Sequence, residues 1–396
     1  MKSGFVAIIL RFLAQLWKIF LGVIGCIKRT MQQNGEARPT RQGKVIAVLM
    51  FVGRLLLNAM LKLWAFCTAA LLLLLLLYWM YGTLPAFILL TFAVIGFLYN
   101  AQDVLLYYPD QPPQSRLYVE SPVLFGMPYE NIYHKTQDGV RINMQFIPRP
   151  EDQKPNAPTL VYFHGNAGNI GHRLTNVYVL YIYLGFNVLS VEYRGYGKSG
   201  GTPCEQGLYL DAAAAMDYLL TRTDINLNKI LVFGRSLGGA VATNLAAHPV
   251  YSHNICALIL ENTFTSLPDI GRTLFNFQVV NSLPDWCFKN QYPSMELVKQ
   301  IKTPTLFISG QADALIPPPM MESLHAASNS IFKKIVRFEG GTHNETWRSA
   351  GYYDAFKKFL AEVYKIPTKK RERAGSQSFV AEMPFDDGAT GTVKAL

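Results

Sequence analysis

The sequence predicts an α/β domain, with a mostly parallel sheet and helices on both of its faces, behind an N-terminal membrane anchor. Short β-branched, apolar segments alternate with helical patterns along the second half of the chain, which is typical of such a sheet. A G-x-S-x-G motif lies between one of these strands and the next helix. Before residue 100, a long apolar block carries no charge. We therefore expect a membrane-associated region over residues 1–100, a folded body over 101–366 and a disordered polar tail over 367–396.

The apolar block over residues 63–99 predicts a membrane-spanning segment. Its 37 residues carry no charged side chain, whereas one span needs about 20 apolar residues. The block lies too deep in the chain for a cleaved signal peptide. Gly82-Thr83-Leu84-Pro85 divides it, and the second half, Ala86–Tyr99, is short for a span of its own. We expect one tilted or kinked span, with a tight hairpin or re-entrant pair as the alternative.

Two earlier segments, Phe5–Ile27 and Val45–Trp64, each carry a polar stripe at helical spacing. They resemble interfacial helices, and the alternative is two further spans. Residues 1–100 hold ten basic groups and one acid, so the net charge of +10 is almost entirely N-terminal. A nucleic-acid-binding protein would carry such charge on its folded domain, so we predict a membrane partner and no nucleic acid.

The cationic N-terminal region is expected to remain in the cytosol. With one span the chain is then a single-pass type II protein with a signal-anchor, its folded body lumenal or exofacial, in an endomembrane or the plasma membrane. A hairpin would instead return the body to the cytosol. Asn344-Glu345-Thr346 is a possible glycosylation site, which fits the lumenal side.

Strands and helices alternate through the body. Ile132–Phe146, with Asp138-Gly139 at its centre, predicts a β-hairpin. The expected strands that follow are Thr159–Phe163, Asn187–Glu192, Ile230–Gly234, Cys256–Glu261, Thr305–Ser309 and Lys334–Phe338, and helices include Glu205–Thr221 and Tyr352–Tyr364. Residues 263–301 interrupt the alternation and predict a lid insertion. Its apolar side chains could fill a small core, form a wall for an acyl chain, or do both.

Ser236 is the predicted nucleophile. The run Ile230–Phe233 precedes it and the small-residue helical pattern Ala240–Ala247 follows it. Strand, G-x-S-x-G and helix in succession are the context of a nucleophile elbow, in which Gly234 and Gly238 keep side chains out of a sharp turn. The hydroxyl is then presented at the carboxyl edge of the sheet.

Asp313 and His343 complete a predicted triad. Each follows a strand, and Ser…Asp…His is the chain order of α/β-hydrolases. His343 would act as the base and Asp313 would orient it. Glu261 is the first alternative carboxylate. His172 is a rival base that fits the order less well, and Cys204 lacks an elbow of its own.

The oxyanion hole is expected at the turn after Thr159–Phe163. His164 precedes Gly165 there and should orient the turn rather than react. We predict the backbone N–H groups of Asn166 and Leu237 as the two donors. Arg194 and Arg235 flank the expected cleft, where they could bind an anionic substrate group or pair with nearby acids. The sequence contains no cofactor motif or metal-ligand spacing, so we predict neither.

Three stretches carry a resemblance to a known family, and they are residues 164–173 (HGNAGNIGHR), 192–199 (EYRGYGKS) and 234–239 (GRSLGG), supported by residues 102–109, 261–264 and 341–344. Over residues 98–365 the chain resembles the membrane-anchored α/β-hydrolase-domain proteins, in particular the Bem-type hydrolases (member thirteen of the animal series). The resemblance implies an α/β-hydrolase fold and a serine hydrolase. Neighbouring families cleave palmitoyl thioesters on proteins or lysophospholipids.

These observations together predict a membrane-anchored serine hydrolase that acts on an ester or thioester of a lipid or an acylated protein, by an acyl-enzyme mechanism. The alternative is a catalytically silent membrane scaffold in polarity or trafficking.

Overall fold

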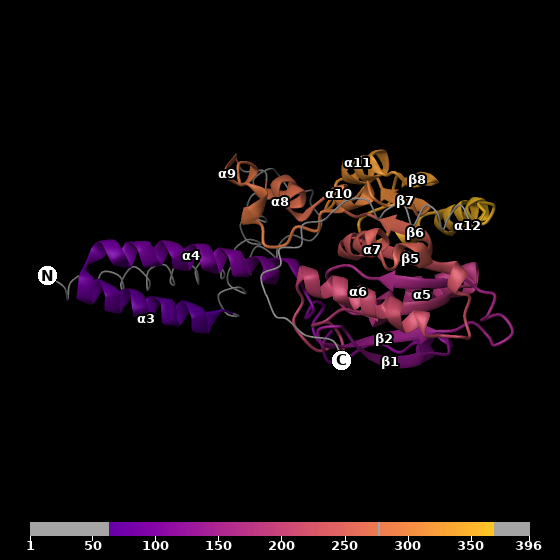
Figure 1. Ribbon diagram of the computed structural model, residues 1–396, viewed down its shortest axis with the longest axis horizontal. Helices are drawn as coiled ribbons and strands as arrows, with labels where there is room; N and C mark the ends of the chain where they lie inside the picture. Colours follow the sequence, from indigo (N-terminus) through magenta and orange to yellow (C-terminus); the bar gives the residue numbers. More distant parts are fainter. Residues whose placement is uncertain (1–62, 276–277, 368–396) are drawn as a thin grey trace, which may run out of the picture. The chain divides into compact units, whose positions relative to one another are not determined.

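The computed structural model describes residues 63–275 and 278–367, and the chain divides into two compact units between Leu106 and Tyr107 (Figure 1). The predicted helix over Phe5–Ile27, nearly all of that over Val45–Trp64, and the tail from residue 368 onward lie outside the described residues.

The first unit is a hairpin of two helices, α3 (Trp64–Tyr81) and α4 (Thr83–Leu106). Gly82 alone separates them, with φ +92°, and its N–H donates to the carbonyl of Tyr78. Gly96 of α4 lies against the Phe66 ring of α3, so the two helices pack side by side. Both are long and apolar enough to cross a membrane.

The expectation that the second half of the apolar block is too short to span was wrong. α4 has 24 residues, because it begins at Thr83 and continues past Tyr99 to Leu106. Pro85 lies in its first turn, where a missing backbone N–H removes no intrahelical hydrogen bond. The Gly-Thr-Leu-Pro sequence therefore starts a second helix instead of kinking a single one.

The second unit is built on an eight-stranded sheet in the order β1-β2-β4-β3-β5-β6-β7-β8. The strands are β1 (Glu130–Lys135), β2 (Arg141–Ile147), β3 (Thr159–Phe163), β4 (Asn187–Glu192), β5 (Ile230–Arg235), β6 (Ile255–Glu261), β7 (Thr305–Gly310) and β8 (Lys333–Phe338). β2 is antiparallel to both of its neighbours, β1 and β4. The six strands from β4 to β8 in the sheet order pair in parallel. This is the predicted α/β-hydrolase sheet.

Helices cover the sheet (Figure 1). The longer ones are α5 (Leu174–Leu184), α6 (Glu205–Leu220), α7 (Leu237–Ala247), α11 (Pro318–Ala327) and α12 (Tyr352–Val363). Contacts pair α5 with α12, and join α7 to α6. Fully buried side chains of α5 and α12, such as Leu180 and Phe356, pack with Tyr162 and Phe233 of the central strands to form the core. Short 3-10 turns occur at η1 (Pro122–Phe125), η2 (Gly171–Arg173), η3 (Leu227–Lys229), η4 (Ser252–Asn254) and η6 (Thr346–Arg348).

The interruption predicted after β6 is a helical insertion. It contains α8 (Leu267–Phe275), α9 (Gln278–Asn281), η5 (Asp285–Cys287) and α10 (Ser294–Val298), after which the chain enters β7. α10 contacts α7 and α11, so the end of the insertion is packed on the sheet-covering helices.

The predicted site residues all lie where parallel strands end. β3 ends before His164, β5 ends at Arg235, β7 ends at Gly310 and β8 ends at Phe338. The carboxyl ends of neighbouring parallel strands share one edge of the sheet, which is where α/β proteins bind their ligands. Residues far apart in the sequence are therefore gathered at this edge.

Candidate active site

The turn at Ser236 has the geometry of a nucleophile elbow. Ser236 has φ +56° and ψ −124° and stands directly between β5 and α7. A Cβ added at Gly234 would lie 2.1 Å from the carbonyl oxygen of Gly238, and one added at Gly238 would lie 2.2 Å from that of Phe163. Only glycine fits at both positions, so the two glycines of the motif permit the close turn.

The three predicted triad residues meet at this edge of the sheet. His343 Nε2 lies 3.1 Å from Ser236 Oγ, and His343 Nδ1 lies 2.7 Å from Asp313 Oδ2. The other carboxylate oxygen of Asp313 accepts the N–H groups of Leu315 and Ile316, both at 2.8 Å. These bonds fix the orientation of the carboxylate, whose side chain is almost fully buried.

The rival groups have other partners. Glu261 is buried, and its Oε2 accepts a hydrogen bond from the Tyr352 hydroxyl at 2.5 Å. Burial raises the pKa of Glu261, which makes it a poor substitute for an ionised orienting carboxylate. His172 Nδ1 accepts the N–H of Asn169 at 3.1 Å, within the loop after β3. The structure thus brings His343, and not His172, to Ser236.

The loop after β3 passes directly beside the nucleophile. A Cβ added at Gly165 would lie 3.5 Å from Ser236 Cβ. The Asn166 carbonyl accepts the Tyr108 N–H at 3.0 Å and the Tyr196 hydroxyl at 2.8 Å. These two hydrogen bonds hold the peptide group between Asn166 and Ala167 in place.

His164 orients the predicted donor itself. Its Nδ1 lies 2.7 Å from the carbonyl oxygen of Gly165. That carbonyl and the N–H of Asn166 belong to the same planar peptide group, so fixing one direction fixes the other. Leu237, the second predicted donor, is the first residue of α7, and N–H groups in the first turn of a helix have no intrahelical acceptor.

Glu192 is a residue of this site that the sequence reasoning did not single out. Its Oε1 lies 3.2 Å from His164 Nε2, and both side chains are fully buried. The two atoms are at ion-pair distance without the alignment of a hydrogen bond. Its Oε2 accepts the N–H of Ile170 at 3.2 Å. The sequence signal that could have indicated Glu192 is an acidic residue at the carboxyl end of the otherwise uncharged strand β4, which is buried along its whole length.

The two arginines predicted to flank the cleft lie in different environments. Arg194 is paired with Asp211 at 2.9 Å and with Asp138 at 2.7 Å. The hydrogen bond from Arg194 is the main reason that the pKa of Asp138 is lowered. This geometry supports the structural interpretation of Arg194. Arg235 is buried, and its Nη1 donates to the carbonyl of Asn344 at 3.3 Å, so it holds the loop that carries His343.

The possible glycosylation site also lies in the His343 loop. The side chain of Asn344 is exposed, whereas Thr346 is fully buried, with its Oγ1 donating to the carbonyl of Thr342 at 2.7 Å. In the folded protein the hydroxyl of the sequon is therefore inaccessible.

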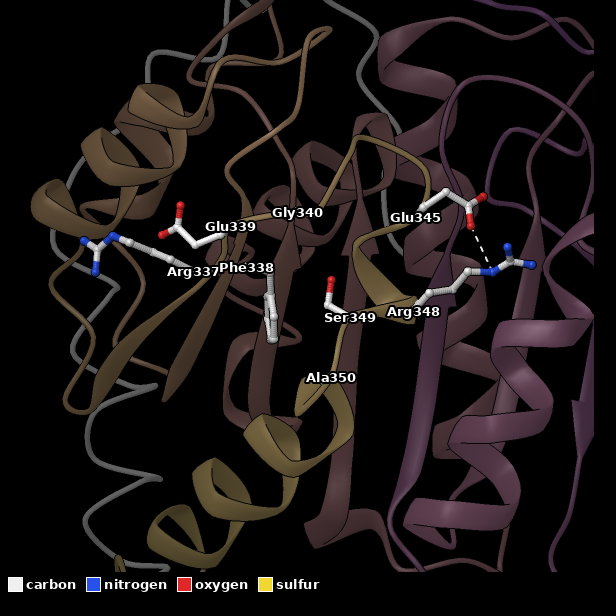
Figure 2. A pocket seen from close by; sticks show the side chains of 8 residues that line it. All are labelled: Arg337, Phe338, Glu339, Gly340, Glu345, Arg348, Ser349 and Ala350. Atoms are coloured by element: carbon white, nitrogen blue, oxygen red, sulfur yellow. Dashed lines mark ion pairs between the residues drawn. The ribbon is translucent and has the colours of Figure 1, made fainter.

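A cavity of about 550 Å³ is lined by residues at the end of β8 and at and around η6. Figure 2 shows its lining, in which Arg348 is paired with Glu345 and the side chain of Arg337 points away from the centre. Phe338 is its one large apolar side chain. Such a polar, charged lining does not suit an acyl chain. Within residues 63–275 and 278–367, no three His, Cys, Asp or Glu side chains are grouped to hold a metal ion.

The sequence is similar to those of several known proteins. The profile of the family described as "alpha/beta hydrolase fold" matches residues 158–286. Protein bem46 of Schizosaccharomyces pombe is 41% identical over 272 residues, covering 69% of this chain and 90% of that protein. The α/β-hydrolase domain-containing protein WAV2 of Arabidopsis thaliana is 38% identical over 297 residues, covering 72% and 94%. A protein of Saccharomyces cerevisiae described as an uncharacterized membrane protein is 34% identical over 280 residues, covering 70% and 95%.

Solved structures give the same fold. The esterase Pf2001 of Pyrococcus furiosus superimposes with a TM-score of 0.50 and 20% identity, covering 66% of this chain and 97% of the esterase. At this identity the likeness concerns the fold alone.

Proposed function

Because the chain belongs to the Bem46-type family of α/β-hydrolase-domain proteins, we propose that it is a serine hydrolase that cleaves an ester or thioester of a lipidic acyl substrate. One observation carries the proposal: the Ser236 hydroxyl, the His343 imidazole and the Asp313 carboxylate form a continuous chain of contacts of 3.1 and 2.7 Å. An isolated scaffold has no need for a strained serine beside a histidine that a carboxylate orients.

Acyl transfer would proceed in two steps. Ser236 Oγ attacks the carbonyl carbon while His343 Nε2 takes its proton, and Asp313 stabilises the imidazolium that forms. The imidazolium then protonates the departing alcohol or thiol, which leaves an acyl-serine. Water attacks this ester as His343 takes one of its protons, and the imidazolium then returns the proton to Ser236 Oγ as the acyl–serine bond breaks, which releases the fatty acid and free Ser236.

The negative charge that develops on the carbonyl oxygen of the substrate would be stabilised by hydrogen bonds from the backbone N–H groups of Asn166 and Leu237. The His164–Gly165 contact orients the first, and the start of α7 supplies the second. Removing one such donor typically costs about 2.7–4 kcal/mol of transition-state stabilisation. Each step thus uses groups that the protein holds in position before substrate binds.

A lipidic substrate is favoured by the N-terminal unit. Two apolar helices of spanning length precede the hydrolase unit, and Tyr107, which follows α4, is already buried in that unit. A membrane-anchored enzyme meets acyl chains in the bilayer and lipid-modified proteins on its surface. Palmitoyl-protein thioesters and lysophospholipids are therefore the substrate classes we propose.

We further propose that α3 and α4 cross the membrane as a hairpin. The type II arrangement with a lumenal hydrolase depended on a short second segment, whereas α4 has 24 residues. Arg54 and Lys62, with the basic residues before them, favour a cytosolic start for α3. Two spans then return Tyr107 and the hydrolase unit to the cytosol, the side on which protein palmitoyl groups are found.

The proposal predicts labelling by a fluorophosphonate probe, which reacts with activated serines. The full-length protein in detergent should be labelled, and Ser236→Ala should abolish labelling while leaving the melting temperature nearly unchanged. Ser190→Ala is the matched control, because Ser190 is also buried but lies inside β4. Equal labelling of Ser236→Ala and the wild type would refute the assignment. An unlabelled wild type would favour the alternative of a silent scaffold.

A further inference from the structure

Three consecutive residues, Glu261 at the end of β6 and Asn262 and Thr263 directly after it, contact the segments that carry all three members of the proposed triad. The Ser236 N–H donates to the carbonyl of Glu261 at 3.0 Å, and Thr263 Oγ1 donates to the carbonyl of Ser236 at 2.8 Å. Both peptide groups of the nucleophile are thus bound to β6 and the residues after it.

Asn262 contacts the other two segments through a single amide. Its Oδ1 accepts the N–H of Gly310 at 2.8 Å, three residues before Asp313. Its Nδ2 donates to Thr346 Oγ1 at 3.0 Å and faces the carbonyl oxygens of Thr342 and His343, each at 3.3 Å. Since Thr346 Oγ1 already donates its own hydrogen to Thr342, it accepts from Asn262.

The backbone at this position restricts which residue can make these contacts. Asn262 has φ +45°, a left-handed conformation that glycine, asparagine and aspartate adopt most readily. The side chain is 1% exposed. Glycine would fit the backbone but lacks the amide, and aspartate could accept from Gly310 but could not donate to the His343 loop. Of these three residues, only asparagine satisfies the backbone and both loops.

We propose that Asn262 is a positioning residue for the triad, which sets the separation of the Asp313 and His343 loops and thereby the 2.7 Å contact between their side chains. The inference rests on the proposed function and deepens it. Asn262 does not touch the nucleophile's hydroxyl, so its effect should fall on the rate of reaction and not on probe binding. A misplacement of about 1 Å in such a site can cost about 10²-fold in rate.

The test measures fluorophosphonate inactivation of the full-length protein at several probe concentrations, which separates the maximal rate, kinact, from the apparent affinity, KI. Asn262→Asp and Asn262→Gly should lower kinact about 10- to 100-fold with KI nearly unchanged.

Asn187→Asp is the matched control. Asn187 is a fully buried amide that also donates to a carbonyl and a hydroxyl and accepts a backbone N–H, but it lies at the start of β4, at the opposite edge of the sheet. It should lower the melting temperature and leave kinact of the folded protein unchanged. If folded Asn262→Gly reacts at the wild-type rate, or if Asn187→Asp slows the reaction as much, Asn262 is not a positioning residue. Failure of the wild type to react would overturn the proposed function itself, so the two failures are distinguishable.

Discussion

Ser236 combines a strained backbone with the hydroxyl that we propose as the nucleophile. Its φ of +56° lies in a region that costs a non-glycine residue on the order of 1–3 kcal/mol. The backbone hydrogen bonds to Glu261 and from Thr263 hold it there, and the helix that follows begins at the next residue. The strain belongs to the backbone and not to the hydroxyl, so replacing the side chain by alanine leaves it in place.

The carboxylate of the proposed triad, Asp313, gives a prediction at the same scale. Asp313→Asn should keep the fold but favour the wrong tautomer of His343, which would lower the rate by up to about 10⁴-fold. The rate of fluorophosphonate labelling measures this loss. Asp217→Asn, which changes a carboxylate bonded to the Tyr251 hydroxyl, should label normally. A nearly unchanged rate for Asp313→Asn would mean that another carboxylate orients His343.

The sequence was sufficient to single out Ser236, Asp313 and His343 as side chains that lie together, because each follows a strand in the order that the fold requires, while their catalytic roles stay a prediction. It could not show the pair His164 and Glu192. Their contact arises because β3 and β4 lie side by side with Phe163 opposite Val191, a register that is not visible in either segment alone. Asn262 was missed for the same reason, since its partners lie about 50 and 80 residues further along the chain.

At the scale of helices and strands, the prediction from sequence depends on recognising where each element begins and ends. The alternation of strands and helices was predicted with small errors at the ends, because apolar runs of five to seven residues between turns are a strong signal. For the apolar block we expected first a single tilted or kinked helix and only second the hairpin of α3 and α4 that the structure has. A glycine and a proline three residues apart indicate a break in a helix, but the same two residues also end one helix and begin the next.

The loop that carries Asn166 gives the prediction at the scale of elements. Tyr196→Phe removes one of two donors to the Asn166 carbonyl and leaves the Tyr108 N–H. The loss of one hydrogen bond is worth about 1 kcal/mol, so kinact should fall about fivefold. Tyr209→Phe removes a comparable bond, to Glu205, away from this loop, and should not change the rate. An equal loss in both variants would show that the loop is not held through Tyr196.

The whole molecule combines a hydrolase unit with a pair of apolar helices, and under the proposed membrane anchoring its orientation would decide which substrates it can meet. In sealed microsomes, added protease should digest the hydrolase unit without detergent if α3 and α4 form a membrane-spanning hairpin. A lumenal marker protein should survive the same treatment, which confirms that the vesicles are closed. Protection of the hydrolase unit until detergent is added would restore the type II arrangement and a lumenal substrate.

The junction at Tyr107 and Tyr108 has a consequence for kinetics. α4 ends at Leu106, and two residues further along the chain the N–H of Tyr108 donates to the Asn166 carbonyl in the hydrolase unit. With α4 in a bilayer, the enzyme and an acylated substrate diffuse in the same two dimensions. Turnover would then follow the mole fraction of substrate among the lipids, and diluting the membrane with inert lipid would slow the reaction even when the amount of substrate per millilitre stays constant.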